Sequence, residues 1–242
     1  MDKRSIDIII PTFDRKDFIE MLLDNIKDRA GFPHRVIVVL QPSEDDTALF
    51  LENNKHLYDI LIETKKRMYL SQALNLGLKK VESEDFVVMN DDTLVGTDNW
   101  LDKLYTAYKD DNWFAMLPYI VPDREFKLDL ESLNNNIVRA NGHWSSWCRI
   151  QNTKKVSDYG GFKLWLRHGD RDFEGGTFGN MAAYYKQLIG RHYGIKAIDL
   201  SVIWKYKIHD EIIQYFLNKG ELPYEVMESS RRGDLKASRN SK

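Results

Sequence analysis

Short apolar runs alternate with amphipathic stretches in the first half of this 242-residue chain. Apolar, β-branched runs that end at proline or polar residues predict strands at residues 6–10, 35–40, 58–62, 86–89 and 113–119. Between them, apolar positions at helical spacing predict helices around residues 18–26, 43–54, 70–81 and 98–109. Strands that alternate with helices of this length predict βαβ units, and therefore an α/β fold with a mostly parallel sheet flanked by helices.

The regular alternation ends after Pro122. Residues 123–160 combine charged side chains, an asparagine run and a tryptophan pair, which predicts irregular structure or a hairpin. Farther along, the pattern predicts a helix at residues 180–191, an extended segment at 197–206 and a closing helix at 209–219.

The chain is best divided into two halves of a single domain, residues 1–120 and 121–227, followed by a tail at residues 228–242. The tail is polar and basic, and this composition predicts disorder. A basic arm that binds a phosphate-rich partner is the alternative interpretation, and it is the only hint of nucleic-acid binding.

Bulk composition narrows the class of protein. A net charge of −2 provides no general attraction to nucleic acid or to an anionic membrane. No apolar run approaches the ~20 residues that cross a bilayer, so we expect no membrane span. Cys148 is the single cysteine, which excludes an internal disulfide and favours the reducing cytoplasm.

Two adjacent carboxylates, Asp91 and Asp92, follow the apolar run at residues 86–89. In open α/β sheets, ligands bind in the crevice beyond the carboxyl ends of the strands, where this pair is expected to lie. Carboxylates crowded together repel each other, and a divalent cation that also holds phosphates relieves the repulsion. The alternative is an ordinary polar turn, because Asn and Asp favour turns.

Four motifs in the first half share the order and spacing of a known family. They are Pro11-Thr12-Phe13-Asp14-Arg15 after the first strand, an acidic loop from Gln41 to Thr47, Asn75-Leu76-Gly77 on a helix, and Asn90-Asp91-Asp92. Together they resemble the nucleotide-sugar half of a GT-A glycosyltransferase, most similar to the inverting family 2. The resemblance implies a Rossmann-like GT-A sheet, with an acceptor-binding half at its C-terminal side.

The resemblance also implies a site for a nucleoside diphosphate sugar, with a UDP-sugar favoured. The implied binding residues are Pro11, Thr12, Phe13, Arg15, Gln41, Arg67, Asn75, Asn90 and Asp91. In the family the Gln41 position commonly holds an aspartate that accepts a hydrogen bond from uracil. Glutamine both donates and accepts, so uracil, guanine and thymine stay open. Arg67, with Lys65 and Lys66, would offset the pyrophosphate charge, or would lie in a solvated turn.

The metal site implied by the resemblance consists of Asp92 and His209 and holds Mn²⁺ or Mg²⁺. The ion would neutralise charge on the departing diphosphate. Imidazole suits Mn²⁺ better than Mg²⁺, although His209 also has a plain interpretation as a helix-start residue.

The second half must supply the catalytic base. Gly160-Gly161-Phe162 is followed by His168-Gly169-Asp170-Arg171-Asp172, which resembles the family's glycine pair and acidic pair. Counting without gaps favours Asp172 as the base, and a shift at Gly169 favours Asp170. A base would take the proton from the acceptor hydroxyl. A charged surface turn is the alternative.

The expected activity is metal-dependent transfer of a hexosyl or pentosyl group, with inversion, to a hydroxyl of a glycan, a lipid-linked sugar or a modified nucleobase. Trp144, Trp147 and Trp165 are candidates for stacking on the acceptor, although aromatic side chains are more often part of a core. Two alternatives stay open: a DNA-modifying glycosyltransferase of the same fold, and an inactive nucleotide-sugar-binding protein. A nucleotidyltransferase is disfavoured because no glycine follows the first strand in residues 11–15.

Overall fold

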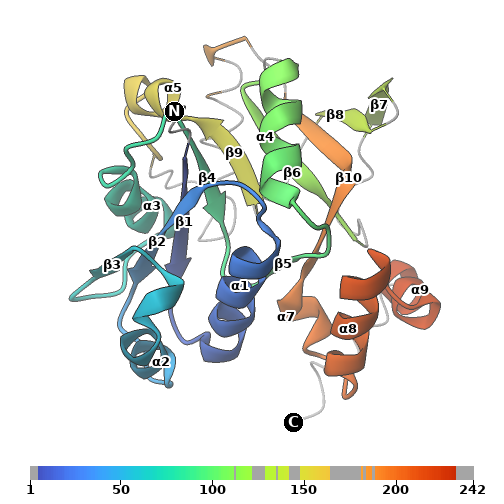
Figure 1. The fold of residues 1–242 in the computed structure, drawn as a ribbon, viewed down its shortest axis with the longest axis horizontal. Coiled ribbons are helices and arrows are strands. Elements are labelled where there is room, and N and C mark those ends of the chain that lie inside the picture. The colour runs from blue at the N-terminus through green and yellow to red at the C-terminus, as the bar shows by residue number, and fades with distance from the viewer. Residues whose placement is uncertain are drawn as a thin grey trace.

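The computed structural model describes residues 5–111, 113–121, 129–134, 136–141, 148–163, 181, 184–186 and 189–232. The described strands form one ten-stranded mixed sheet with helices on both faces (Figure 1). Along the sheet the strand order is β3-β2-β1-β4-β9-β6-β10-β8-β7, and β5 pairs with β10 off this path. The predicted α/β architecture is therefore confirmed.

Residues 6–89 build four parallel strands of this ten-stranded sheet. The elements of this part are β1 (Ile6–Thr12), α1 (Lys16–Arg29), β2 (His34–Leu40), α2 (Thr47–Asn53), a 3₁₀ turn (Lys55–Leu57), β3 (Ile60–Glu63), α3 (Leu70–Leu78) and β4 (Asp85–Met89). In the register, Ile9 of β1 lies opposite Ile37 of β2 and Val88 of β4. Each strand and helix that the sequence predicted in residues 6–89 is present, with ends that differ by a few residues.

The rest of the chain, from residue 93 onward, joins these four strands through an antiparallel strand. Its elements are β5 (Thr93–Val95), α4 (Trp100–Asp110), β6 (Ala115–Ile120), β7 (Asp129–Asn134), β8 (Ile137–Asn141), β9 (Cys148–Asn152), α5 (Thr153–Asp158), β10 (Ile189–Asp199), α7 (Leu200–Ile203), α8 (His209–Lys219) and α9 (Tyr224–Arg232). Strand β9 inserts between β4 and β6 and is antiparallel to both. The hairpin alternative for residues 123–160 is confirmed in part, because β7 and β8 pair antiparallel.

Two predictions for the second half were wrong in part. The helix predicted at residues 180–191 overlaps β10, which begins at Ile189 and pairs with β6 from that residue onward. The segment predicted to be extended over residues 197–206 is extended only to Asp199, and helix α7 begins at the next residue, Leu200. Asp199 caps α7 by accepting a hydrogen bond from the Ser201 N–H at 2.8 Å, which explains the early end of the strand.

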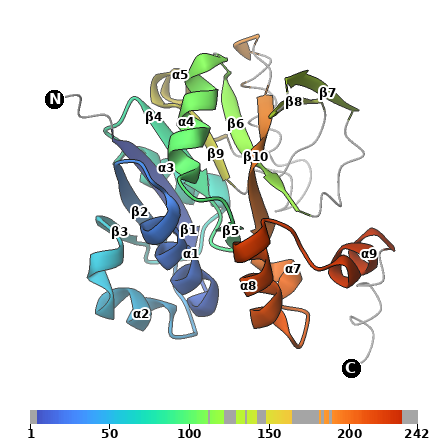
Figure 2. The ribbon, with the colours of Figure 1, turned by 45° about the vertical axis from the view of Figure 1, so that its right-hand side comes forward.

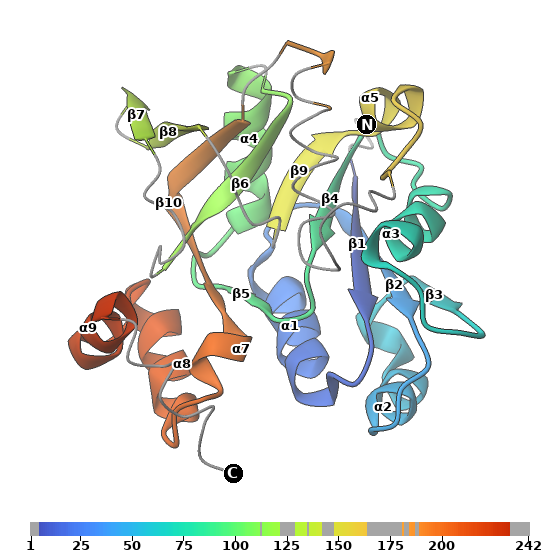
Figure 3. The ribbon, with the colours of Figure 1, turned by 180° about the vertical axis from the view of Figure 1, so that it is seen from behind.

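Alternating side chains of β1 separate two cores. Ile8 and Ile10 face a core built with α1, α2 and α4, whereas Ile9 faces a second core built with α3 and α5. Figure 1 shows α1 and α4 in front of the sheet, and Figure 3, from behind, shows α3 and α5 in front of it. At Gly77 of α3 a Cβ atom would lie 2.4 Å from Ile9 Cγ2, so only glycine allows this close packing of helix on strand.

A third core lies at the C-terminal side, where α7, α8 and α9 gather below β10 (Figure 2). Helix α9 extends to Arg232, so the segment expected to be a disordered tail from residue 228 begins inside a helix. Residues 233–242 lie outside the described part of the chain. No helix among the described residues is long and apolar enough to cross a membrane.

Candidate active site

The loops that follow β1, β2 and β4 meet at one edge of the sheet and border a cleft of about 1240 Å³. The cleft is lined by Pro11, Phe13, Arg15, Gln41, Lys66, Arg67, Met68, Tyr69, Leu70, Gln72, Leu76, Asn90, Asp91 and Asp92. This is the edge at which open α/β sheets bind ligands. The loops of three separate motifs, after β1, β2 and β4, therefore share one cavity.

Hydrogen bonds between the first two loops fix the wall of the cleft. The Asp14 N–H donates to Ser43 Oγ at 3.1 Å, and the Glu44 N–H donates to the Asp14 carboxylate at 2.6 Å. Asp14 adopts a left-handed backbone with φ of 49°, a conformation that Asp and Asn tolerate better than most residues. The acidic residue in the Pro11–Arg15 motif thus has a local structural reason.

Asp91 points back toward the first strand. Its Oδ2 accepts a hydrogen bond from Thr12 Oγ1 at 2.8 Å. Burial raises the pKa of Asp91 to about 6, although the Thr12 hydrogen bond and the Arg15 charge both lower it. A carboxylate in this position is costly to keep ionised without a further positive group.

Asp92 lies in a more strongly acidic environment. Burial, and then the charges of Asp199 and Asp91, raise the pKa of Asp92 to about 7, while the charge of Arg15 opposes the shift. The Asp92 carbonyl accepts from the Leu200 N–H at 2.7 Å, and Thr93 pairs with Asp199 across β5 and β10. These contacts bring the start of α7 against the end of β4.

Asp199 was not predicted as a site residue. Burial raises its pKa as well, even though Ser201 donates hydrogen bonds to its carboxylate. The sequence carried one signal for it, an acidic residue directly after the apolar positions Ala197 and Ile198. Its approach to Asp92 depends on the pairing of β5 with β10, which the local pattern does not encode.

Asn90 presents an unsatisfied acceptor at the same edge. Its backbone carbonyl accepts from the Thr93 N–H at 3.1 Å, which closes the turn after β4. Its side-chain oxygen is buried and has no hydrogen-bond partner among the described residues. A buried acceptor without a donor is unfavourable by about 1–3 kcal/mol, so a ligand hydroxyl here would be stabilised.

The opposite end of the cleft is less acidic. Gln41 is 3% exposed, and its Oε1 accepts a hydrogen bond from the Met68 N–H at 2.7 Å. Arg67 forms an ion pair with Asp14, donates to the Pro42 carbonyl at 3.2 Å and lies 4.8 Å from the Phe13 ring centroid. Arg67 therefore lies in the cleft, as predicted, with part of its charge already paired.

Asn75 does not line the cleft formed by the described residues. Its amide makes two hydrogen bonds with the backbone of Phe162, donating to the carbonyl at 2.8 Å and accepting from the N–H at 2.9 Å. Gly161 has φ of 74°, and a Cβ atom there would lie 2.4 Å from Asn75 Oδ1. The helix motif and the Gly-Gly-Phe motif are therefore joined by hydrogen bonds, and the nucleotide-sugar-binding role of Asn75 stays a prediction.

His209 lies at the first turn of α8. Its ring packs on Trp204, with centroids 4.1 Å apart, and its Nδ1 lies 3.1 Å from the Tyr206 carbonyl. Its Nε2 lies 3.5 Å from the Asp210 carboxylate. None of these contacts joins His209 to Asp92, so its role as a metal ligand stays a prediction.

Five predicted site residues lie outside the described part of the chain. They are the two candidate bases, Asp170 and Asp172, and the three candidate acceptor platforms, Trp144, Trp147 and Trp165.

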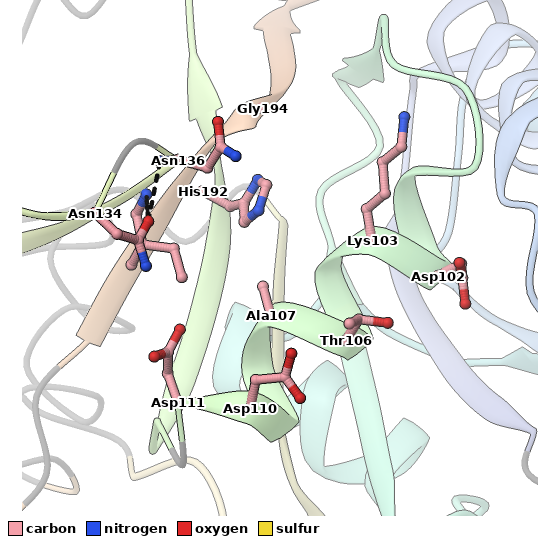
Figure 4. Close-up of a pocket in the computed structure, with 11 residues that line it drawn as sticks. Asp102, Lys103, Thr106, Ala107, Asp110, Asp111, Asn134, Asn136, His192 and Gly194 are labelled. Carbon is pink, nitrogen blue, oxygen red and sulfur yellow. Dashed lines mark hydrogen bonds between the residues drawn. The ribbon is translucent and has the colours of Figure 1, made fainter.

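A second hollow of about 830 Å³ lies between α4, the β7–β8 turn and the bend of β10 (Figure 4). His192, Asp110, Asp111 and Asn136 are among its lining residues, and none of its lining residues also lines the first cleft. Burial, and then the nearby Lys103 charge, lower the pKa of His192. This hollow lies beside a helix and not at the carboxyl ends of β1 and β4, so the first cleft is the better candidate for the active site.

The carboxylates suit a divalent cation that has ligands from a bound phosphate. Among the described residues, no group of three or more His, Cys, Asp or Glu side chains is arranged to hold a metal ion on its own. Asp91 and Asp92 provide two carboxylates, a number suited to Mg²⁺ or Mn²⁺ when phosphate oxygens and water supply the other ligands. Burial is the first cause of the raised pKa in both groups, and for Asp92 the charges of Asp199 and Asp91 add to it.

The protein-family model for glycosyl transferase family 2 matches residues 7–206. The chain belongs to glycosyl transferase family 2. The match includes both carboxylates, the cleft loops and the Gly-Gly-Phe segment. No sequence of a curated protein matches the chain.

Solved structures of glycosyltransferases share the fold. S. aureus TarS is 19% identical with a TM-score of 0.60, over 89% of this chain and 43% of TarS. TarS 1-349 in complex with UDP-GlcNAc is 18% identical with a TM-score of 0.61, over 81% of this chain and 58% of that one. The mannosyltransferase PcManGT from Pyrobaculum calidifontis, in complex with GDP-Man and Mn²⁺, is 15% identical with a TM-score of 0.61, over 99% of this chain and 76% of that one. These likenesses show the GT-A fold, and the chain spans less than half the length of TarS.

Proposed function

We propose that this family 2 chain is a glycosyltransferase that moves a hexosyl or pentosyl group from a nucleoside diphosphate sugar to a hydroxyl acceptor. One observation carries the proposal: Asp91 and Asp92 are crowded at the carboxyl end of β4, in a cleft that also opens onto the loops after β1 and β2. A ligand that brings a cation to this pair and extends along the cleft fits both features. A metal-bound nucleoside diphosphate has that composition.

Within this proposal, Asp91 and Asp92 hold Mn²⁺ or Mg²⁺ together with the diphosphate. Held by these two carboxylates, such an ion would supply positive charge to the departing diphosphate without a proton transfer. The Thr12 hydroxyl donates to Asp91 Oδ2 and so restrains that carboxylate. His209 remains a candidate for a further ligand if the α7–α8 segment moves toward Asp92.

The other cleft residues position the donor. The buried Asn90 oxygen would accept a hydrogen bond from a ribose or sugar hydroxyl. Lys66 and Arg67 stand on the loop before α3 and would lie beside the pyrophosphate. The Phe13 ring, which is 40% exposed and has Arg67 near its face, offers an apolar surface to the nucleoside.

We further propose that transfer proceeds with inversion and that Asp172, or Asp170, takes the proton from the acceptor hydroxyl. The acceptor side would include Trp144, Trp147 and Trp165. The solved relatives support a nucleoside diphosphate sugar as donor, because TarS is described with UDP-GlcNAc and PcManGT with GDP-Man and Mn²⁺. A UDP-sugar donor and a cytoplasmic location stay predictions.

The test is binding and turnover with a panel of nucleoside diphosphate sugars, with Mn²⁺ and with a chelator. We expect at least one donor to raise the melting temperature, and to do so only when the divalent ion is present. If no nucleoside diphosphate or its sugar stabilises the protein, the proposal is wrong. Slow cleavage of the bound donor, measured as free nucleoside diphosphate, would identify an enzyme. An inactive binding protein would leave the donor intact.

The base is identified by comparing Asp172→Asn with Asp170→Asn. The variant that removes the base loses turnover and keeps donor affinity, because the base acts only on the acceptor. Full activity in both variants would exclude both residues as the base.

A further inference from the structure

The side chain of Asn75, on helix α3, holds the backbone of Phe162 through both of its amide atoms. Nδ2 donates to the Phe162 carbonyl at 2.8 Å, and Oδ1 accepts from the Phe162 N–H at 2.9 Å. Within the described part of the chain, neither backbone group of Phe162 has another hydrogen-bond partner. The Asn75 amide thus takes the place of the backbone partner that a neighbouring strand would provide.

The turn before Phe162 is shaped to receive this amide. Gly160 and Gly161, which follow α5, have positive φ values of 88° and 74°. A Cβ atom at Gly161 would lie 2.4 Å from Asn75 Oδ1, so a side chain there would meet both backbone strain and a collision. The Asn-x-Gly and Gly-Gly-Phe motifs, whose Asn75 and Phe162 are 87 residues apart, therefore form a single joint.

This joint contacts two of the elements that form the candidate active-site cleft. Helix α3, which carries Asn75, lines the cleft with Gln72 and Leu76. Phe162 is 4% exposed, and its ring packs edge-on against Phe86 of β4 with centroids 6.5 Å apart. Strand β4 leads directly to the two cleft carboxylates. The position of the Gly-Gly-Phe turn is therefore fixed relative to the cleft.

After Phe162 the chain continues into the residues that include the candidate bases, Asp170 and Asp172. We infer that Asn75 is a positioning residue of the proposed transfer reaction, which holds the Gly-Gly-Phe turn so that turnover, and not donor affinity, depends on its amide. Asn75 acts through Phe162, because both of its polar side-chain atoms are engaged there. A displacement of about 1 Å far from the chemistry can lower a rate by ~100-fold.

This inference rests on the proposed function, and its test separates donor binding from donor cleavage. The probe is the nucleoside diphosphate sugar that raises the melting temperature most in the donor panel, in the presence of Mn²⁺. We expect Asn75→Ala to bind it within about twofold of the unaltered chain and to form free nucleoside diphosphate at least ~10-fold more slowly.

Asn75→Asp is a second variant of nearly the same size, which keeps the test decisive if the Ala variant does not fold. It retains an acceptor for the Phe162 N–H and places an oxygen against the Phe162 carbonyl. We expect the same combination of retained donor affinity and slower cleavage.

Asn25→Ala is the matched control. Asn25 of α1 makes the same pair of hydrogen bonds with the backbone of Val95, at 3.0 and 3.1 Å. Its removal should lower the melting temperature about as much as Asn75→Ala does, because both lose two hydrogen bonds. Val95 stays in place through the pairing of β5 with β10, so the cleavage rate should remain close to that of the unaltered chain.

Amide hydrogen exchange at Phe162 reports directly on the joint. Asn75→Ala should raise the exchange rate of this N–H by ~10-fold or more, since it loses its acceptor, whereas Asn25→Ala should not.

Three outcomes would overturn the inference and leave the proposed function intact. A loss of donor affinity as large as the loss of cleavage would show that Asn75 contacts the donor. Normal cleavage by Asn75→Ala, with faster exchange at Phe162, would show that the position of the turn does not matter. An equal loss of cleavage in Asn25→Ala would assign the effect to stability alone.

Failure of the unaltered chain itself has a different meaning. If the unaltered chain binds no donor, the proposed function is lost together with the inference. If it binds a donor and never cleaves it, the enzymatic part of the proposed function and the inference both fail.

Discussion

The two ends of the parallel strands treat buried aspartates in opposite ways. At the amino end of β1, Asp7 accepts hydrogen bonds from Arg35 Nε at 2.6 Å, the Glu82 N–H at 2.7 Å and the Ser83 N–H at 2.9 Å. Burial raises its pKa, but the bonds from Arg35, Ser83 and Glu82 outweigh this, and the net pKa is lowered. At the carboxyl ends, the pKa values of Asp91 and Asp92 are raised.

The difference separates a structural carboxylate from a binding one. The chain itself supplies hydrogen-bond donors to Asp7. These donors stabilise its ionised carboxylate in the absence of any ligand. Asp91 has one hydroxyl donor, and Asp92 has two acidic neighbours. The Arg15 charge and the backbone donors lower both pKa values but do not offset burial. Unfavourable negative charge therefore lies at the carboxyl end of β4, which is typical of a site where a cation binds.

The largest expected effect is the loss of stability on substitution of Asp7, at the amino end of β1. Asp7→Ala should lower the free energy of unfolding by about 3–5 kcal/mol, because it removes the buried carboxylate that accepts from Arg35 and from the N–H groups of Glu82 and Ser83. Chemical denaturation measures the loss. Nucleotide affinity of the folded fraction should be unchanged, because Asp7 lies at the far end of β1 from the cleft.

The control for this variant is Asp24→Ala, which removes an exposed carboxylate on α1. It should change the unfolding free energy by about 0.5 kcal/mol or less. A loss below about 1 kcal/mol for Asp7→Ala would show that the Asp7 network is not what makes this end stable.

At the carboxyl end of the strands we expect the opposite pattern, a loss of nucleotide affinity without a loss of stability. Asp92→Asn should weaken Mn²⁺-dependent binding of the nucleoside diphosphate by about 100-fold, an effect comparable to the loss of one preorganised charged contact. It should leave the unfolding free energy of the nucleotide-free protein equal or slightly higher, since it removes a buried charge that repels Asp91 and Asp199. Titration calorimetry and denaturation, on the same preparation, measure the two quantities.

Removal of the divalent ion by a chelator should reproduce the binding defect in the unaltered chain and add nothing to that of Asp92→Asn. Undiminished Mn²⁺-dependent binding by Asp92→Asn would exclude Asp92 as a ligand.

The parallel end of the fold was predictable because its signals are local. The apolar runs at β1, β2 and β4 and the motifs that follow them are each encoded within about ten residues, and the topology then places their ends together. For the same reason the sequence predicted cleft residues correctly. Four of them line the cleft, namely Asp91, Asp92, Gln41 and Arg67, and a fifth, Thr12, donates a hydrogen bond to Asp91.

The features that were missed depend on contacts between distant segments. Strand β9 is only five residues long, and its apolar Cys148 and Ile150 are buried together with the polar Arg149 and Gln151. Its place between β4 and β6 depends on pairing with both strands. Asn75 is tied to Phe162, 87 residues away. Asp199 reaches Asp92 only because β5 pairs with β10. No local pattern carries these three facts.

Acid should unfold the protein partly through Asp7. Its folded pKa is lowered from the ordinary value of 3.8, so its stabilising contribution is complete above that value and is lost as pH falls through the lower folded value. The difference in unfolding free energy between the unaltered chain and Asp7→Asn should therefore be constant from pH 7 to about 5 and shrink below about pH 4. A difference that does not change over this range would contradict the lowered pKa.

The smallest expected effect concerns the single hydrogen bond between Thr12 and Asp91. Thr12 is the hydroxyl donor that Asp91 receives from the neighbouring strand, and it is 1% exposed. Thr12→Val keeps the shape and removes the donor, which should weaken Mn²⁺-dependent nucleotide binding by about 1 kcal/mol, or roughly fivefold. Thr12→Ser keeps the hydroxyl and should bind more nearly like the unaltered chain. Equal affinity of the Val and Ser variants would mean that Asp91 does not need the Thr12 hydroxyl, and the contrast with Asp7 would then rest on Asp92 alone.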